Sequence, residues 1–319
     1  MGKGGNEEHH HHGHGNEKAR KHENQHREKN GEKKHSKQQH NHHVEEQHSG
    51  GKAAQHCTVD QACTPEVLEL LGKTTGLSDK TAWANIWLLI SKGEQDNDKL
   101  SGAFEVEGDK GSLFGYASAL SYDRKQRGVT LGIVGWTTAD GGKDDGDAEE
   151  LFRQFKEAGG EDLLDACKGC TKDQGKAQSL ITKIRALGSD PKFVHAQWQN
   201  LCSGEGYIKK TIEGWKKAGI DKPSALAIAT VLDASLNQGW DGKDVGVTNL
   251  EKLAVHGDED KTLEKYNAWR RKVAGTSEYN DPRANGEHRA DMFEILRKAK
   301  NFNLKSDASL KKALSWEMK

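Results

Sequence analysis

One apolar segment constrains the fold of this 319-residue chain more than any other feature of its sequence. The segment SALAIATVLDASLNQGW has the composition of a buried helix, which we place over 223–237, and Asp233 stands in its apolar middle. A carboxylate buried in a core is costly unless a cation is paired with it. Arg271, Arg283 and Arg289 follow in polar helical or turn sequence and are the natural partners. The sequence therefore predicts a buried ion pair that joins at least two helices.

The large apolar residues that a core needs are confined to one part of the chain. Residues 1–56 hold 13 of the 16 histidines and no aromatic residue, so they cannot bury enough apolar surface to offset their ordering entropy. We predict that 1–56 is a disordered, histidine-rich polar tail. Residues 57–319 hold all eight tryptophans and form the predicted folded domain. Only four prolines, and few runs of β-branched residues, favour a mainly α fold.

Charge and hydropathy argue against several classes of protein. The formal net charge of −1, with neutral histidines, does not suggest a nucleic-acid-binding protein. No stretch approaches the roughly 20 apolar residues that cross a bilayer, and no apolar segment of a signal peptide is visible at the N-terminus. One short acidic segment favours either a cationic ligand or a solvated loop that enters a helix. Its members are Asp140, Asp144, Asp145, Asp147, Glu149 and Glu150.

The cysteine content does not decide between an oxidising and a reducing compartment. The chain has five of them, so at least one thiol has no disulfide partner within the chain. Cys57 with Cys63, and Cys167 with Cys170, could close small loops in an oxidising compartment. The CKGC motif lacks a second CxxC or a close histidine, which argues against a zinc site. No cofactor is predicted.

Helical patterns dominate the folded domain. Thr64 and Pro65 are typical of a helix start, and a second helix is predicted from Ser78 to near Gly93, which would leave Glu94 just past its end. Between 101 and 136, Gly and Asp punctuate short apolar runs, as in turns and brief strands. The other predicted helices are 148–157, 174–187, 191–202, 205–217, 223–237, 260–274, 286–299 and 307–316.

Two carboxyl groups have surroundings that would move their pKa values apart. Glu94 follows an apolar helix with two tryptophans, which could keep it protonated, whereas Arg127 would keep the nearby Asp123 ionised. Hydrolysis of a glycosidic bond needs one carboxylic acid to protonate the leaving oxygen and a second carboxylate to attack the sugar or to activate water. Carboxylates are plentiful in the chain, and Glu105 and Glu107 remain alternative acids.

Several segments in order resemble the chitosanases of glycoside hydrolase family 46. SKGEQDN resembles the family's Ser-Ala-Glu-Asn segment, which implies Glu94 as the general acid. SYDRKQRGVTLGIVGWTT resembles the Asp-Gly-Arg-Gly-Tyr-Thr-x-Gly-Ile-Ile-Gly-Phe signature. This match implies Asp123 as the general base and Thr130 as the residue that helps to hold the attacking water. The ordered matches cover about residues 82–316.

The same resemblance implies roles for five further residues. DDGDAEELFRQF matches the element whose Asp recognises the substrate amine, which implies Asp147. VLDASLNQG matches the segment with the buried Asp of a charge relay, Asp233. WRRKVAG and SEYNDPRANGEHR resemble the paired-arginine region, which implies Arg271 and Arg283 as relay members and Glu278 as a substrate contact.

The family implies a two-lobed, lysozyme-like fold, mainly α, with a small β-sheet beside the active-site cleft. It also implies an endo-acting enzyme that cuts the β-1,4 bonds of chitosan with inversion, with Arg127 among the residues that line the cleft. Such an enzyme would be a secreted monomer whose partner is chitosan, with no nucleic acid and no membrane bound.

Two other interpretations stay open. A muramidase on the same scaffold is one, because a fold does not fix a substrate. The other is a non-catalytic protein that binds polysaccharide, or metal through its tail. Imidazoles of the tail could chelate divalent metal adventitiously, although its composition favours a flexible polar extension, or in part an expression tag. The candidate tail ligands are His9, His10, His11, His12, His14, His40, His42 and His43.

Overall fold

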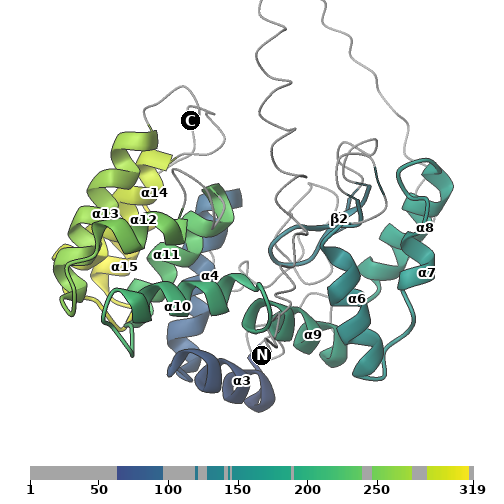
Figure 1. The fold of residues 1–319 in the computed structure, drawn as a ribbon, viewed down its shortest axis with the longest axis horizontal. Helices are drawn as coiled ribbons and strands as arrows, with labels where there is room; N and C mark the ends of the chain where they lie inside the picture. Colours follow the sequence, from purple (N-terminus) through teal and green to yellow (C-terminus); the bar gives the residue numbers. More distant parts are fainter. Residues whose placement is uncertain are drawn as a thin grey trace, which may run out of the picture. The chain divides into compact units, whose positions relative to one another are not determined.

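The computed structural model divides the chain into two units, Met1–Gly51 and Lys52–Lys319. All the described residues belong to the second unit (Figure 1). The predicted tail, 1–56, lies outside them. The described residues are 63–95, 119–120, 128–139, 143, 146–187, 190–238, 246–274 and 286–315.

Helices account for most of the described chain, and the strands are short. The helices are α3 (Pro65–Thr75), α4 (Lys80–Gln95), α6 (Ala148–Glu157), α7 (Leu164–Cys167), α8 (Gln174–Arg185), α9 (Pro191–Cys202), α10 (Tyr207–Lys217), α11 (Ala225–Gln238), α12 (Gly246–Leu253), α13 (Glu259–Ala274), α14 (Gly286–Lys298) and α15 (Ala308–Ala313). The strands are β1 (Ala119–Leu120), β2 (Thr130–Leu131) and β3 (Trp136–Thr137). The predicted mainly α fold with a small sheet is confirmed.

Helix α3 begins and ends by the rules of helix capping. The Thr64 side chain accepts a hydrogen bond from the backbone N–H of Val67 at 3.3 Å, and Pro65 occupies the first helical position. Gly76 ends α3 in the left-handed conformation with φ of 79°, and its N–H donates to the Gly72 carbonyl at 2.9 Å. The predicted start of this helix is confirmed.

Helix α4 extends further than its sequence predicted. It runs through Gly93 to Gln95, so the backbone of Glu94 lies in its last turn and not beyond its end. A glycine inside a helix costs about 1 kcal/mol relative to alanine, which is why the helix was expected to stop there. The buried guanidinium of Arg289 packs against Gly93 and occupies the space that a side chain would need. This packing explains why a glycine stands at this position of the helix.

Helix α11 is the centre of the helical core. It packs against α4, α10, α12, α13 and α14, and Figure 1 shows it surrounded by them. Its residues from Ala225 to Ser235 are all buried, as expected for a helix that is covered on every side. The predicted buried helix around Asp233 is confirmed.

Helix α9 joins a second group of elements to this core. It packs against α3 and α10 on the one hand and against α6 on the other. Its Trp198 is fully buried and meets two tryptophans of α4 edge to face, with ring centroids 5.9 Å from Trp83 and 5.2 Å from Trp87. Such edge contacts add to the stabilisation that burial gives. The position of α9 relative to α4 is therefore tightly defined.

The sheet is antiparallel in the order β1-β2-β3. In the β2–β3 hairpin, Thr130 lies opposite Thr137 and Leu131 lies opposite Trp136. Gly132 and Gly135 of the connecting turn both have φ of 75°, which side chains disfavour and glycine accepts. Brief strands and turns were predicted for 101–136, and they are present in the described part of that stretch, 119–120 and 128–136.

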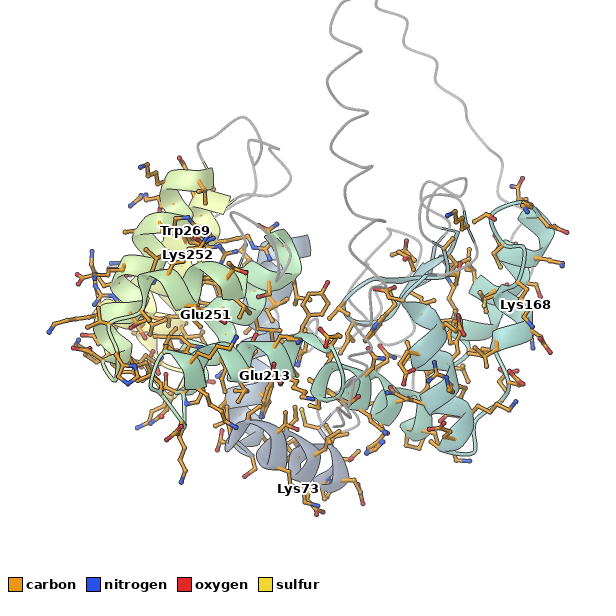
Figure 2. All side chains as sticks on the ribbon, viewed as in Figure 1. Lys73, Lys168, Glu213, Glu251, Lys252 and Trp269 are labelled. Atoms are coloured by element: carbon orange, nitrogen blue, oxygen red, sulfur yellow. The ribbon has the colours of Figure 1, made fainter. Side chains whose placement is uncertain are left out.

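Most ion pairs in the described chain are exposed. Lys73 pairs with Glu69 and Lys168 with Asp165, and all four side chains are more than half exposed; Lys73 and Lys168 are labelled in Figure 2. Pairs of this kind contribute little to stability, because water screens them. The fold therefore depends on its apolar core and on the few ion pairs that are buried. Among the described helices, none is long and apolar enough to span a membrane.

Candidate active site

A buried cluster of three charged side chains lies at the centre of the helical core. The Asp233 carboxylate of α11 accepts hydrogen bonds from Arg289 of α14, at 2.6 Å from Nη2 and 3.1 Å from Nε. It also accepts one at 2.5 Å from Nη2 of Arg270 on α13. All three side chains are fully buried. We call Asp233, Arg270 and Arg289 the buried charge cluster.

The two guanidinium groups determine the ionisation of Asp233. Burial alone would raise the pKa of this carboxyl group, but the charges and hydrogen bonds of Arg289 and Arg270 outweigh it and hold the pKa below its usual value. Asp233 is therefore ionised, and the cluster carries a net charge of +1. The predicted pairing of Asp233 with Arg289 is present in the structure.

The second partner of Asp233 is Arg270 and not the predicted Arg271, because Arg270 lies on the buried face of α13. Leu263, Tyr266 and Arg270 follow the three- and four-residue spacing of one helix face and are fully buried. Arg271 lies about 100° further round α13, has a side chain that is 60% exposed, and pairs with Asp291 at 2.9 Å. The buried partner of Asp233 on α13 is thus Arg270 and not the predicted Arg271.

The buried charge cluster reaches the last turn of α4. Nη1 of Arg289 donates to the Gly93 carbonyl oxygen at 3.4 Å. A Cβ atom on Gly93 would lie 2.7 Å from Nε and 2.9 Å from Cζ of Arg289, so only glycine allows this approach. The neighbouring residue in α4 is Glu94, whose side chain lies outside the described part of the structure. The backbone of the predicted acid is therefore next to the residue that the cluster contacts.

Thr130 is buried in β2 with an unsatisfied hydroxyl group. Its side chain is 6% exposed, and Oγ1 has no hydrogen-bond partner among the described residues. Leaving a buried polar group unpaired costs about 1–3 kcal/mol, and such groups in native proteins often meet a water or a ligand. This hydroxyl is suited to hold a water molecule, which is the role that the resemblance implies for it.

Asp147 stands directly before α6 and ties that helix to the hairpin. Its Oδ1 accepts hydrogen bonds from the backbone N–H of Thr137 at 2.6 Å and from the Thr137 hydroxyl at 3.3 Å. It makes no side-chain cap on α6, and it is exposed. The carboxylate is thus accessible to a cationic group from solvent, close to the strand that pairs with Thr130.

The other predicted site residues fall outside the described part of the chain. They are the proposed base and its neighbour, the substrate contact, one relay arginine and the two alternative acids: Asp123, Arg127, Glu278, Arg283, Glu105 and Glu107. The histidines of the tail and Cys57 lie outside it as well. Within the described ranges, no group of three or more His, Cys, Asp or Glu side chains could hold a metal ion.

The CKGC motif forms a tight turn at the end of α7. The Cys167 thiol donates to the Leu164 carbonyl at 3.1 Å, and the Cys170 thiol donates to the Ala166 carbonyl at 3.4 Å. The N–H of Cys170 donates to the Cys167 carbonyl at 3.2 Å, and Gly169 has φ of 82°, as a type II turn requires. Both thiols act here as hydrogen-bond donors.

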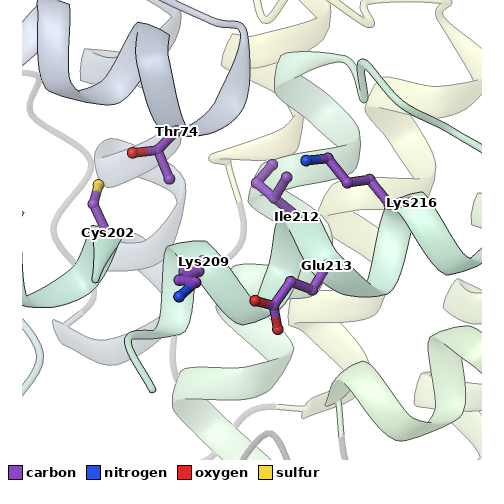
Figure 3. Close-up of a pocket in the computed structure, with 6 residues that line it drawn as sticks. All are labelled: Thr74, Cys202, Lys209, Ile212, Glu213 and Lys216. Atoms are coloured by element: carbon purple, nitrogen blue, oxygen red, sulfur yellow. The ribbon is translucent and has the colours of Figure 1, made fainter. Parts of the chain in front are cut away.

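A pocket of about 260 Å³ lies between α3, α9 and α10 (Figure 3). Its lining residues are Thr74, Cys202, Lys209, Ile212, Glu213 and Lys216. None of the predicted site residues is among them. Burial raises the pKa of the Cys202 thiol to about 11, so this thiol is a poor nucleophile at neutral pH. The pocket is therefore not the predicted catalytic site.

Comparison with known proteins shows a resemblance to chitosanases along most of the chain. A chitosanase from Niallia circulans is 29% identical over 286 residues, which is 85% of this chain and 88% of the relative. A native chitosanase from Bacillus subtilis MY002 has a similar structure, with a TM-score of 0.52 and 21% identity over 72% of this chain and 93% of that chain. No protein-family model matches the chain.

A second solved structure gives the same result. The GH46 chitosanase of Gynuella sunshinyii, in complex with chitotetraose, has a TM-score of 0.51 and 18% identity, again over 72% of this chain and 93% of that chain. Both the predicted lysozyme-like fold and the resemblance to the chitosanases of glycoside hydrolase family 46 are confirmed.

Arg270 is the buried partner of Asp233 that sequence reasoning missed. Its signal was present, since counting back from the arginine pair by steps of three and four reaches Tyr266 and Leu263, whereas the same count from Arg271 reaches Asn267 and Glu264. The apolar series marks the buried face. Among the described site residues, the structure gathers Asp233, Arg270 and Arg289, and Arg289 contacts the last turn of α4.

Proposed function

We propose that this chain, which resembles the chitosanases of glycoside hydrolase family 46, hydrolyses the β-1,4 bonds of chitosan as an endo-acting, inverting enzyme. The observation that carries the proposal is the buried charge cluster, because it is expensive to bury and it ends at the turn of α4 that bears Glu94. Similarity to chitosanases over most of the chain supports the same reaction.

Glu94 is the proposed general acid, and the cluster adjusts its ionisation. Two guanidinium groups alone would place two positive charges near the end of α4 and hold a neighbouring carboxyl group ionised. Asp233 cancels one of these charges, so that Glu94 experiences a net charge of +1. This weaker field lowers the pKa of Glu94 less than two uncompensated guanidinium groups would, which favours the proton that the acid passes to the leaving glycosidic oxygen.

Asp123 is the proposed general base, and Thr130 orients its water. The unsatisfied, buried hydroxyl of Thr130 supports this role, because a water bound there would satisfy it. An inverting pair needs carboxyl groups about 6.5–9.5 Å apart, which leaves space for that water between the base and the sugar. The water attacks the anomeric carbon on the face opposite the leaving oxygen, and Asp123 accepts its proton.

The substrate is a chain of glucosamine units that carry ammonium groups. Asp147 and Glu278 are proposed to attract these groups and Arg127 to line the cleft. The exposed carboxylate of Asp147 supports its part in this proposal. The related Gynuella sunshinyii enzyme was solved in complex with chitotetraose. Because a polymer of this kind does not cross membranes, we propose that the enzyme acts outside the cell. We also propose that it acts as a monomer.

The proposal is tested by digestion of chitosan oligomers, with the first anomer formed followed by proton NMR. The parent chain should release α-anomeric reducing ends, and Glu94→Gln and Asp123→Asn should abolish release with thermal midpoints nearly unchanged. Glu105→Gln and Glu107→Gln serve as matched controls and should remain active. An inactive parent chain, β-anomeric products, or turnover of bacterial cell wall in preference to chitosan would overturn the proposal. Activity retained in Glu94→Gln would show that the acid is misassigned.

A further inference from the structure

Two side chains of α9 hold the β2–β3 hairpin in place. The side-chain oxygen Oε1 of Gln197 accepts a hydrogen bond from the backbone N–H of Ile133 at 3.0 Å. One helical turn further, Oδ1 of Asn200 accepts a hydrogen bond from Nε1 of Trp136 at 2.9 Å. Residues three apart lie on the same face of a helix, so the two bonds act together on the hairpin.

The hairpin has little space to move relative to this helix face. Gln197 is fully buried, and Trp136 is 3% exposed. A Cβ atom on Gly132 would lie 2.7 Å from Oε1 of Gln197 and 2.7 Å from the Trp136 ring. The turn backbone is thus in close contact with both Gln197 and Trp136. Close-packed interiors of this kind transmit displacement and do not absorb it.

Thr130 lies between this contact and a second fixed point. Trp136 pairs with Leu131, the residue after Thr130, so the Asn200 bond acts one residue from the buried hydroxyl. On the other side of Thr130, Val129 and Thr138 are joined by two hydrogen bonds: the N–H of Val129 donates to Thr138 Oγ1 at 2.9 Å, and the N–H of Thr138 donates to the Val129 carbonyl at 3.0 Å. The position of the Thr130 hydroxyl is therefore set by the hairpin as a whole.

The same turn of α9 is also fixed against α4. Trp198, between the two polar side chains in sequence, packs edge to face on Trp83 and Trp87 of α4. Helix α4 bears Glu94 in its last turn. A single helical turn, residues 197–200, thus contacts both the element with the proposed acid and the element with the proposed water-holding hydroxyl.

We propose that Gln197 and Asn200 are positioning residues that fix the distance between the water held by Thr130 and the acid on α4. This inference rests on the function proposed above. A shift of the hairpin by a fraction of an ångström would misplace the attacking water without removing any group that binds the sugar chain. Loss of either hydrogen bond should therefore lower kcat and leave KM almost unchanged.

The test compares Gln197→Met, which keeps the side-chain volume but removes the acceptor, with Gln199→Met on the same helix. Gln199 is only partly buried, so its variant controls for the same chemical change. We expect kcat on a chitosan oligomer to fall about 10- to 100-fold for Gln197→Met, with KM within about twofold, and little change for Gln199→Met. Asn200→Leu should show the same pattern, and Asn200→Asp, which keeps the acceptor oxygen, should restore most of kcat.

The decisive measurement is the loss of kcat that Gln197→Met causes in a protein that already carries Thr130→Val. If Gln197 acts through Thr130, then Gln197→Met should cost less than about twofold in kcat once the hydroxyl is gone, since the two changes remove the same contribution. Equal losses in both backgrounds, or a loss that follows only the unfolded fraction seen by circular dichroism, would overturn the inference. If Gln197→Met does not fold, Asn200→Leu and Asn200→Asp, which change a half-buried residue, are compared in the parent and in Thr130→Val instead. If the parent chain hydrolyses chitosan and the two losses are additive, only the positioning role is refuted. If the parent chain is inactive, both proposals are refuted.

Discussion

Replacement of Gly93 by alanine tests how closely α4 and the buried charge cluster are packed. At an ordinary helical site this change stabilises a protein by about 0.5–1 kcal/mol, because glycine loses more backbone freedom on folding. At Gly93 the new Cβ would lie 2.7 Å from Nε and 2.9 Å from Cζ of Arg289. Real Cβ atoms do not approach so closely, so either the helix or the guanidinium group must shift.

The size of the effect follows from what Arg289 would lose. Its guanidinium makes two hydrogen bonds to Asp233 and one to the Gly93 carbonyl, all buried, so it cannot retreat into solvent. Overpacking costs about 1–3 kcal/mol, and strain on the buried ion pair, whose complete loss costs about 3–5 kcal/mol, adds part of that cost to it. After the helical gain is subtracted, we expect Gly93→Ala to lower the free energy of unfolding by about 1–3 kcal/mol.

The assay is urea and thermal unfolding followed by tryptophan fluorescence and far-UV circular dichroism. For a folded domain of this size the expected loss corresponds to a midpoint lower by about 2–10 °C. Gly175→Ala is the matched control, because Gly175 lies in the exposed first turn of α8 and its nearest neighbour is the end of the Asp173 side chain at 3.2 Å. That variant should be neutral or slightly more stable. A Gly93→Ala protein as stable as the parent would refute the close packing of Arg289 on α4.

Three further predictions concern the buried groups. Arg270→Met should destabilise the fold by about 3–5 kcal/mol and Arg271→Ala by less than about 0.5 kcal/mol in urea unfolding, whereas the reverse order would restore the original assignment. The depressed pKa of Asp233 makes its contribution to stability complete above its unfolded pKa of about 4, and that contribution is lost as pH falls through the lower folded pKa. In a series from pH 6 to pH 2, the thermal midpoint should therefore decrease once the pH is below about 4. A midpoint that stays constant in that range would contradict the pairing. With a thiol pKa of about 11, Cys202 should resist iodoacetamide at pH 7.5 in the native protein and react after unfolding, as mass spectrometry of the peptide would show; rapid native alkylation would contradict its burial.

The sequence predicted the features that depend on composition and short spacing. The buried helix around Asp233, the need for a cationic partner and the start of α3 at Thr64 all follow from local patterns. Two helices, α6 and α9, have the predicted bounds, Ala148–Glu157 and Pro191–Cys202. In both helices the apolar face and the flanking residues predict the same bounds.

Features that depend on tertiary contact were not predictable in the same way. The choice between Arg270 and Arg271 needs the phase of α13, which two adjacent arginines leave ambiguous. Helix α12 was missed because it begins at Gly246, where a Cβ atom would lie 2.5 Å from Ser235 Oγ, so that packing on α11 and not helix propensity places it there. The need for glycine at position 93 of α4 likewise comes from a side chain 196 residues away in sequence.

The arrangement of the buried charge cluster has a consequence for synthesis of the protein. Its three members, and the α4 carbonyl that Arg289 contacts, come from helices spread over nearly 200 residues, and the arginines are the last to leave the ribosome. Until α14 has emerged, the Asp233 carboxylate lacks the two hydrogen bonds that Arg289 donates, so full burial of α11 stays costly. Nascent chains that stop before residue 289 should accordingly remain protease-sensitive in α4 and α11, and the core should close only when translation is nearly complete.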